Sequence, residues 1–311
     1  MKVVMPGGSG HVGAAIRRWL EPKGWTFTVL TRRPSKSDEV EWDGRTLDAW
    51  SDAIDGCDLV INLAGRSVNC RYNRRNLDEM MDSRVDSTRV IGEAIAAAKN
   101  PPRLWLQAST ATIYRQRFDA PNDDLRGELG GDEPGTPYKW KASIAIAKAW
   151  EAELEKAHTP KTRKVAMRSS ITMSIDKGSV FDVLATLARR GLGGAAGNGT
   201  QYVSWVHEED FACSLEFLVE HEELSGPVNI CSPNPLPNAE FMRILRQAVG
   251  ARWALPQPRW LLEIGAAVLG TETELVLKSR RVVPRRLLDA GFKFMHPHWS
   301  EAARELTSRR P

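Results

Sequence analysis

The sequence predicts an α/β fold, a doubly wound parallel sheet followed by a second, smaller C-terminal domain. Three observations support this. A short apolar run at Val3–Met5 breaks into glycines at positions 7, 10 and 13 and resumes as a helical pattern. Apolar β-rich runs then alternate with helical patterns as far as Arg168, which is typical of parallel sheets. Beyond Arg168, glycine and proline clusters interrupt the alternation.

The alternation defines the expected elements in order. Strands are expected at Val3–Met5, Thr26–Thr31, Leu59–Leu63, Leu104–Ala108, Val165–Arg168 and Val228–Cys231, and helices near 11–20, 76–98, 139–157 and 208–220. The helix from Asn76 is the clearest, because its apolar residues recur near one stripe and Pro101-Pro102 ends it. Residues 115–137, rich in Gly, Asp and Pro, are expected to form a long loop over the active-site edge.

The domain boundaries follow from the change in pattern. Residues 1–168 are expected to form the first domain, to which 206–232 return, and residues 169–311, mainly 169–205 and 233–311, the smaller one. With 311 residues, the chain is long enough for this division.

The glycine loop is the strongest functional signal. Strand, glycine turn and helix N-terminus in this order place backbone N–H groups and the helix dipole where they can bind a pyrophosphate. Gly7 permits the tight turn, Gly10 lets phosphates approach the backbone, and Gly13 lets helix and strand pack closely. His11 and Val12 belong to the same loop and are expected to lie beside the cofactor. The alternative is a tight strand–helix turn without a ligand.

The end of the second strand indicates which dinucleotide is bound. Thr31 is followed by Arg32 and Arg33, and no carboxylate is present to accept the ribose 2′-hydroxyl of NAD(H). Because guanidinium groups suit a phosphate dianion, NADP(H) is favoured over NAD(H). Alternatively, the arginines are simply solvated at a turn. Small residues at later strand ends, Leu63, Ala64, Gly65 and Ala108, are expected to let the dinucleotide lie against the backbone.

Composition excludes several function classes. A net charge of +4 is small for this length and does not suggest a nucleic-acid partner. The apolar run Trp260–Leu269 is interrupted by Glu263 and is too short to span a bilayer. The four cysteines lack metal-ligand spacing, so reduced thiols, a cytoplasmic location and no metal site are expected. We expect a monomer or homodimer with a small-molecule substrate.

Short motifs that together are typical of one protein family occur along nearly the whole chain. They are Gly7-Gly-Ser-Gly-His-Val-Gly13, Asn62-Leu-Ala-Gly65, Asp82-Ser-Arg-Val85, Ala108-Ser109 with Tyr114, Trp150-Glu151, Gly197-Asn-Gly-Thr-Gln201, Ser204-Trp-Val-His207 and Gly291-Phe-Lys-Phe294. Together they resemble the extended short-chain dehydrogenase/reductases. More closely, they resemble the atypical branch of NAD-dependent epimerase/dehydratase-like, or sugar-nucleotide epimerase-like, proteins.

This resemblance implies a Rossmann domain carrying NADP(H) and a smaller domain that closes over the nicotinamide. It implies that Arg84 faces the cofactor and that Arg168 and Ser170 lie beside the nicotinamide. It also implies that four residues line the substrate side of the site: Gln201, Ser204, Trp205 and His207.

The catalytic residues of the wider family are only partly present. Short-chain dehydrogenases use a tyrosine, a lysine four residues later and a hydroxyl residue. Thr110 occupies the position of the hydroxyl residue. Lys141 follows Tyr138 by three residues instead of the four that the family pattern requires. When the helix is aligned on Trp150-Glu151 instead, Ser143 and Ala147 fall at the two positions, and neither supports the chemistry.

Histidine offers another proton carrier near neutral pH. His207 is a candidate, but the alternative role of capping the helix near Glu208 is favoured. His296 and His298 are expected at the surface without metal-ligand partners. Two functions remain open: an NADP(H)-dependent oxidoreductase or epimerase acting on a small or nucleotide-linked substrate, and a non-catalytic NADP(H)-binding redox sensor or partner-binding module.

Overall fold

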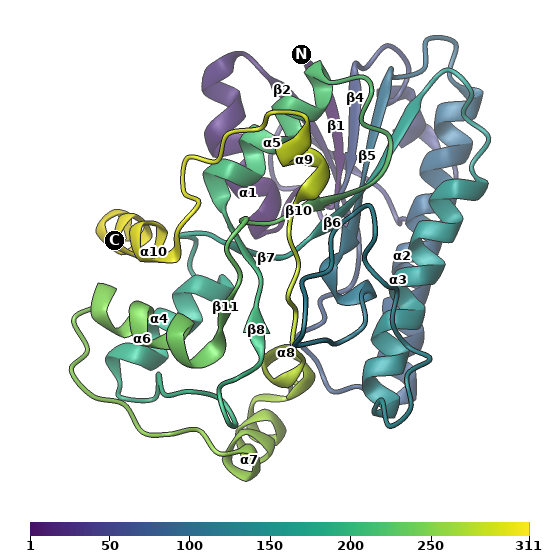
Figure 1. Cartoon of the computed structure of the whole chain (residues 1–311). Coiled ribbons are helices and arrows are strands. Elements are labelled where there is room, and N and C mark those ends of the chain that lie inside the picture. Colours follow the sequence, from purple (N-terminus) through teal and green to yellow (C-terminus); the bar gives the residue numbers. More distant parts are fainter. Residues whose placement is uncertain (311) are drawn as a thin grey trace.

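The computed structural model describes residues 1–310 and has a seven-stranded parallel sheet at its centre (Figure 1). The strand order is β10-β6-β5-β4-β1-β2-β3, and every neighbouring pair is parallel. The strands are β1 (Lys2–Pro6), β2 (Thr26–Thr31), β3 (Glu39–Glu41), β4 (Leu59–Asn62), β5 (Leu104–Thr110), β6 (Arg163–Ser169) and β10 (Gly226–Ile230). From β1 the chain adds β2 and β3 on one side and β4, β5, β6 and β10 on the other. This arrangement confirms the predicted doubly wound sheet.

Helices cover both faces of this sheet. On one face α1 (His11–Leu20) packs against α5 (Glu208–Glu220), and their apolar side chains share a core with β1, β4, β5 and β6. On the other face α2 (Arg74–Ala97) and α3 (Tyr138–Lys156) lie side by side, as Figure 1 shows. Their cluster includes Ile91, Ile95 and Leu154, packed on Val60 and Trp105 of the sheet.

Most predicted elements occur within two residues of their expected limits. The helix expected from Asn76 begins at Arg74, because Asn73 caps it by accepting a hydrogen bond from the Asn76 N–H. The edge strand β3 was not predicted, because three residues alternating Glu-Val-Glu carry too little apolar signal. Three short 3₁₀ helices, η1 (Glu21–Lys23), η2 (Ala49–Ala53) and η3 (Ala111–Ile113), complete this half of the chain.

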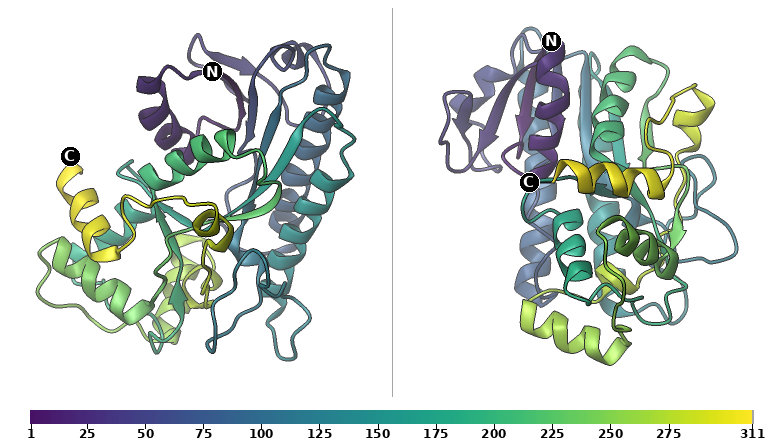
Figure 2. Two further views of the ribbon diagram at one scale, coloured as in Figure 1. Left: turned by 45° about the horizontal axis from the view of Figure 1, so that its top comes forward. Right: turned by 90° about the vertical axis from the view of Figure 1, so that its left-hand side faces the viewer.

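Most of the remaining elements gather at one end of the sheet (Figures 1 and 2), whereas α9 (Arg285–Asp289) packs beside β10 and contributes Leu287 to the sheet core. The others are β7 (Ile171–Met173), α4 (Val180–Arg189), β8 (Tyr202–Val203), β9 (Trp205–His207), β11 (Leu236–Pro237), α6 (Asn238–Ala248), α7 (Arg259–Leu269), α8 (Glu274–Leu277) and α10 (Trp299–Arg309). Here β7 pairs with β9 in parallel, and β8 pairs with β11 antiparallel.

This C-terminal region has its own apolar core. The indole of Trp299 stacks on Phe241 with ring centroids 4.2 Å apart and contacts Trp205 and Phe181. The sheet core and this cluster share no buried residue. Within residues 1–310, no helix is both long enough and apolar enough to cross a membrane.

Candidate functional site

The glycine loop joins the end of β1 to the start of α1. Gly7 has a left-handed φ of +73°, and a Cβ on it would lie 2.8 Å from the Ala64 backbone. A Cβ on Gly13 would lie 2.0 Å from the Gly8 carbonyl oxygen, so helix and loop touch there. Beside Gly10, in contrast, the nearest atom would be 3.8 Å away. The protein itself therefore requires glycine at 7 and 13, whereas the space at Gly10 is free for a ligand.

A cavity of about 380 Å³ opens beside this loop, at the end of β2. Its lining residues are Gly8, Ser9, Ala14, Arg17, Thr31, Arg33, Ser35, Lys36 and Glu39. Arg17 is paired with Glu21 and Asp38. Across the described chain, no carboxylate forms an ion pair with Arg32, Arg33 or Lys36. Arg33 and Lys36 on the cavity wall therefore have no close ion-pair partner, at the strand end where the sequence predicted a phosphate site.

The carboxylate on the cavity wall, that of Glu39, is already bonded to the backbone. Glu39 Oε2 accepts hydrogen bonds from the Ser35 N–H at 2.6 Å, the Ser35 hydroxyl at 3.1 Å and the Lys36 N–H at 3.2 Å. The backbone hydrogen bond from Ser35 is the main cause that lowers the pKa of Glu39. Glu39 thus holds the 35–36 turn in place at the edge of the cavity.

The turn after β4 forms the next wall of the site. The buried Asn62 side chain donates to Gln107 Oε1 at 3.0 Å and accepts from the Ala64 N–H at 3.0 Å, which fixes residues 63–65 against the glycine loop. Arg84 on α2 lies directly beside Gly65, since a Cβ there would be 3.2 Å from Arg84 Cζ. Its guanidinium packs over the Trp150 ring, and burial lowers its pKa to about 10.

The other residues predicted to bind the cofactor differ in how far they are packed into the protein. Val12 packs on the sheet core and His11 lies next to Gly178, while Leu63 is half-buried against the core. Ala108 lies within β5, and Ser170 follows β6 with its N–H donating to the Ile230 carbonyl at 3.0 Å. The structure thus brings the glycine loop, the 63–65 turn, Thr31 and Arg33 together.

Arg168, expected beside the nicotinamide, has its N–H groups engaged inside the protein. It donates to both carboxylate oxygens of Glu151 and to the Tyr114 hydroxyl, which donates in turn to Asn229 Oδ1 at 2.9 Å. Burial lowers the pKa of Arg168, but the hydrogen bonds and charge of Glu151 outweigh it and raise that pKa. Ser109 also donates to Glu151. This network holds α3 against the ends of β5, β6 and β10.

The predicted catalytic trio is not assembled through direct contacts. Thr110 accepts a hydrogen bond from the Thr112 N–H at 3.1 Å and caps η3. Tyr138 is 74% exposed at the first residue of α3, and Lys141 is exposed on the same turn. Within residues 1–310, no hydrogen bond joins any two of these three side chains. Their roles remain predictions.

The four residues expected on the substrate side are buried in this structure: Gln201, Ser204, Trp205 and His207. Gln201 donates to the carbonyls of Ala196 at 2.9 Å and Val276 at 3.2 Å. Trp205 is fully buried against Trp299, with ring centroids 5.0 Å apart. Backbone hydrogen bonds therefore hold the Gln201 amide, and aromatic packing holds the Trp205 ring.

His207 performs the alternative role that the sequence suggested. Its Nδ1 accepts a hydrogen bond from the Glu209 N–H at 3.1 Å and caps α5, which confirms the predicted helix cap. The residue is completely buried, and burial lowers its pKa to about 4. The expectation for His296 was wrong, because this side chain is only partly exposed and bonds Glu209.

The sequence did not reveal a buried polar cluster around α8. Lys278 donates to the Thr112 carbonyl at 2.8 Å, Arg280 to the Thr112 hydroxyl at 3.0 Å, and Ser143 to Glu274 at 2.6 Å. Burial lowers the pKa of Lys278 to about 7. The cluster connects η3 and α3 to the C-terminal region. Charges in a segment without helical periodicity give no signal that they will be buried.

Comparisons with known proteins identify what this chain is similar to. Residues 3–231 match the NAD dependent epimerase/dehydratase family and residues 257–306 match a domain of unknown function, DUF1731. The chain is 31% identical to the epimerase family protein SDR39U1 of Bos taurus, over 98% of this chain and 99% of that protein. A crystal structure of human SDR39U1 with NADPH superposes with a TM-score of 0.85 at 27% identity, covering 99% of this chain and 100% of that one. A UDP-N-acetylglucosamine 4-epimerase from Bacillus cereus, at 17% identity, shares the fold with a TM-score of 0.76, covering 99% of this chain and 96% of that one.

Proposed function

The chain belongs to the NAD dependent epimerase/dehydratase family, and we propose that it is an NADP(H)-dependent oxidoreductase or epimerase acting on a small or nucleotide-linked substrate. The dinucleotide would lie across the carboxyl ends of the strands, where ligands bind in open parallel sheets. The N-terminus of α1 and the open space beside Gly10 would hold its pyrophosphate.

The cavity at the end of β2 carries this proposal. Arg33 and Lys36 on its wall form no ion pair within residues 1–310, and Glu39 already accepts three hydrogen bonds from residues 35 and 36. A ribose 2′-phosphate placed there would satisfy both cations, whereas the 2′-hydroxyl of NAD(H) would leave them without a partner. The NADPH in the human SDR39U1 structure supports the same choice.

The remaining binding surface follows from the neighbouring strand ends. Leu63, Ala64 and Gly65 place backbone and small side chains beside the glycine loop, and Arg84 lies over Gly65. We propose that residues 169–205 and 233–311 form the substrate-side domain that closes on the cofactor.

For catalysis, NADP(H) supplies or accepts the hydride when bound. We propose that the phenol of Tyr138 carries the proton at the substrate oxygen and that the ammonium group of Lys141, on the same turn of α3, stabilises the phenolate by its charge. Thr110, at the end of β5, donates a hydrogen bond to the same substrate oxygen. Because Tyr138 is exposed in this structure, the proposal requires that the phenol contact the substrate only after the site has closed.

One observation favours the second function, a non-catalytic NADP(H)-binding sensor. The chain lacks the tyrosine–lysine pair at four-residue spacing, and no hydrogen bond among residues 1–310 joins Tyr138 to Thr110 or Lys141. A protein that only binds the dinucleotide would need the cavity and the glycine loop but not these groups.

A substrate screen that follows NADPH oxidation separates the two functions. We expect turnover in the wild type and a loss of about 10²–10⁴-fold in Tyr138→Phe, with unchanged NADPH affinity. Full activity in Tyr138→Phe would remove this tyrosine from the mechanism. Tight NADPH binding without turnover of any aldehyde, ketone or nucleotide-sugar substrate would favour the sensor.

A further inference from the structure

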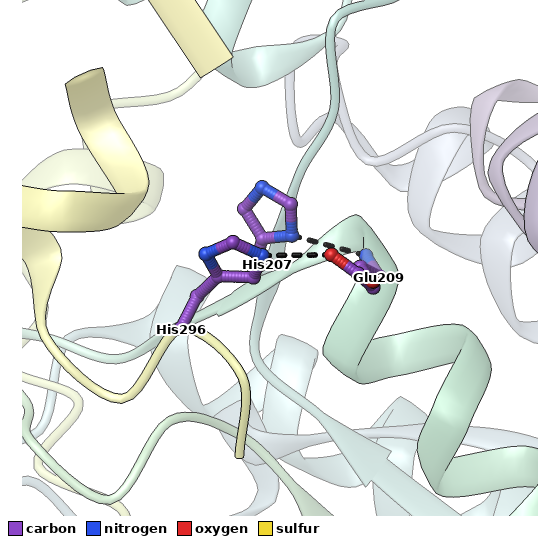
Figure 3. Close-up of side chains that lie close together, drawn as sticks. All are labelled: His207, Glu209 and His296. Carbon is purple, nitrogen blue, oxygen red and sulfur yellow. Dashed lines mark hydrogen bonds and ion pairs between the residues drawn. The ribbon is translucent and has the colours of Figure 1, made fainter. Parts of the chain in front are cut away.

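Two histidines far apart in the sequence meet at the start of α5. The rings of His207 and His296 lie with centroids 3.8 Å apart, next to the carboxylate of Glu209 (Figure 3). One nitrogen from each ring and one carboxylate oxygen all lie within 4.8 Å of one another. None of the three residues lines the cavity beside the glycine loop.

His207 is oriented by its own contacts. Its Nδ1 accepts the Glu209 N–H, so this nitrogen carries a lone pair, and its Nε2 lies 2.8 Å from Glu305 Oε2. With Nδ1 as acceptor, Nε2 carries the proton and donates to Glu305. Metal-binding histidines usually donate their second ring N–H to a carboxylate, which fixes the tautomer and the ring orientation.

His296 is held in place through its backbone. The buried carboxylate of Asp210 accepts hydrogen bonds from the Met295 N–H at 2.7 Å and the His296 N–H at 3.0 Å. The His296 Nε2 lies 2.8 Å from Glu209 Oε2. The loop before α10 is therefore attached to the first turn of α5, and its imidazole is directed at the Glu209 carboxylate.

We propose that His207, Glu209 and His296 form a binding site for a divalent transition-metal ion such as Zn²⁺ or Fe²⁺. Two imidazoles and one carboxylate are a donor set that such ions prefer. Donor atoms that each lie about 2.1 Å from one ion are at most about 4.2 Å apart, so only a small rearrangement brings the three together. The ion replaces the hydrogen bond that caps α5.

The surroundings suit a bound cation. The first turn of α5 contributes Glu208, Glu209 and Asp210, and Glu305 faces the cluster from α10. The positive charges nearby are themselves paired: Arg18 with Glu208, Arg309 with Glu208 and Glu305, and Lys23 with Glu216. The side chains of His296 and Glu209 are 15% and 21% exposed, which leaves access for the ion and for a water ligand. Such an ion would connect the C-terminal segment to α5.

Zinc titration of the untagged, full-length protein tests this site. After removal of metal with a chelator, calorimetry with Zn²⁺ should show one ion per chain, and Zn²⁺ should raise the Tm. His296→Ala and Glu209→Gln should each weaken Zn²⁺ binding by at least about tenfold. His221→Ala is the matched control, because His221 pairs with Glu223 at 2.7 Å without a third ligand, and it should bind Zn²⁺ as the wild type does.

The outcome does not depend on turnover. Circular dichroism and NADPH affinity establish whether each variant is folded. If His296→Ala does not fold, Glu209→Gln alone tests the proposal. Wild-type protein that binds Zn²⁺ no more tightly than Glu209→Gln would overturn the proposal, as would an equal loss of affinity in His221→Ala.

Discussion

Arg168 and Glu151 form a two-point ion pair where β6 meets α3. Arg168 Nε lies 2.8 Å from Glu151 Oε1, and its Nη2 lies 2.7 Å from Oε2. The Nη1 group donates to the Tyr114 hydroxyl at 3.0 Å, so the guanidinium is bound on all sides. Burial raises the pKa of Tyr114 to about 12, so its hydroxyl stays protonated and donates to Asn229. The pair therefore fixes the ends of three strands against one helix.

This arrangement predicts that either partner is needed for stability. Glu151→Gln should lower the free energy of unfolding by about 3 kcal/mol, because it leaves a buried guanidinium without its counter-charge. Urea denaturation measures the difference. The exposed pair of Arg243 and Glu240 serves as the control, and Glu240→Gln should cost less than about 1 kcal/mol. Equal effects at the two pairs would contradict this structural role.

The glycine loop predicts opposite results for two similar substitutions. Gly10→Val should leave the fold intact, because the side chain enters open space, and should abolish NADPH binding by occupying the place of the pyrophosphate. Gly13→Val should destabilise the protein, because its Cβ would overlap the Gly8 carbonyl. Thermal unfolding and NADPH titration of both variants check this. A Gly10→Val protein that binds NADPH normally would place the cofactor elsewhere.

Lys278 predicts a pH dependence of stability. Burial lowers its pKa from 10.5 to about 7 in the folded protein. Below pH 7 the lysine is charged in both states, and above 10.5 it is neutral in both. Between these values the unfolded chain binds the extra proton, so this group makes stability rise with pH.

Unfolding of Lys278→Met and wild type across this range isolates the effect. As pH rises, the free energy of unfolding of the wild type should increase relative to that of Lys278→Met. The total increase should not exceed about 1.4 kcal/mol for each unit by which the Lys278 pKa is lowered. The same change at the exposed Lys161 is the control. A difference that stays constant from pH 7 to pH 10 would show that Lys278 is not perturbed in this way.

The sheet could be predicted from the sequence because its signals are local. Apolar runs, the glycine loop and Pro101-Pro102 each act over a few residues, so the doubly wound parallel sheet and the position of Arg33 at the end of β2 could be predicted from them. The surroundings of Trp205 and Lys278 could not be predicted in the same way. They depend on contacts with Trp299 and Thr112, residues about a hundred or more positions away, for which periodicity carries no information.

The C-terminal region shows the same limit. The pairing of His296 with Glu209 arises because Asp210 binds the backbone of the loop at 295–296. A cap at His207 was recognisable from its position before an acidic helix start, but its partner across the chain was not.

Paired titrations with NADPH and NADH test the central claim most directly. The wild type should bind NADPH more tightly than NADH, and Arg33→Ala should weaken NADPH binding by about tenfold or more, corresponding to a charge-assisted hydrogen bond of roughly 1.5–3 kcal/mol. Arg32→Ala should have a smaller effect, because only Arg33 lines the cavity, and the exposed Arg103→Ala should have none. NADH affinity should be unchanged in all three variants. Equal binding of the two nucleotides by the wild type, or an equal loss of both in Arg33→Ala, would contradict the assignment of this cavity to the 2′-phosphate.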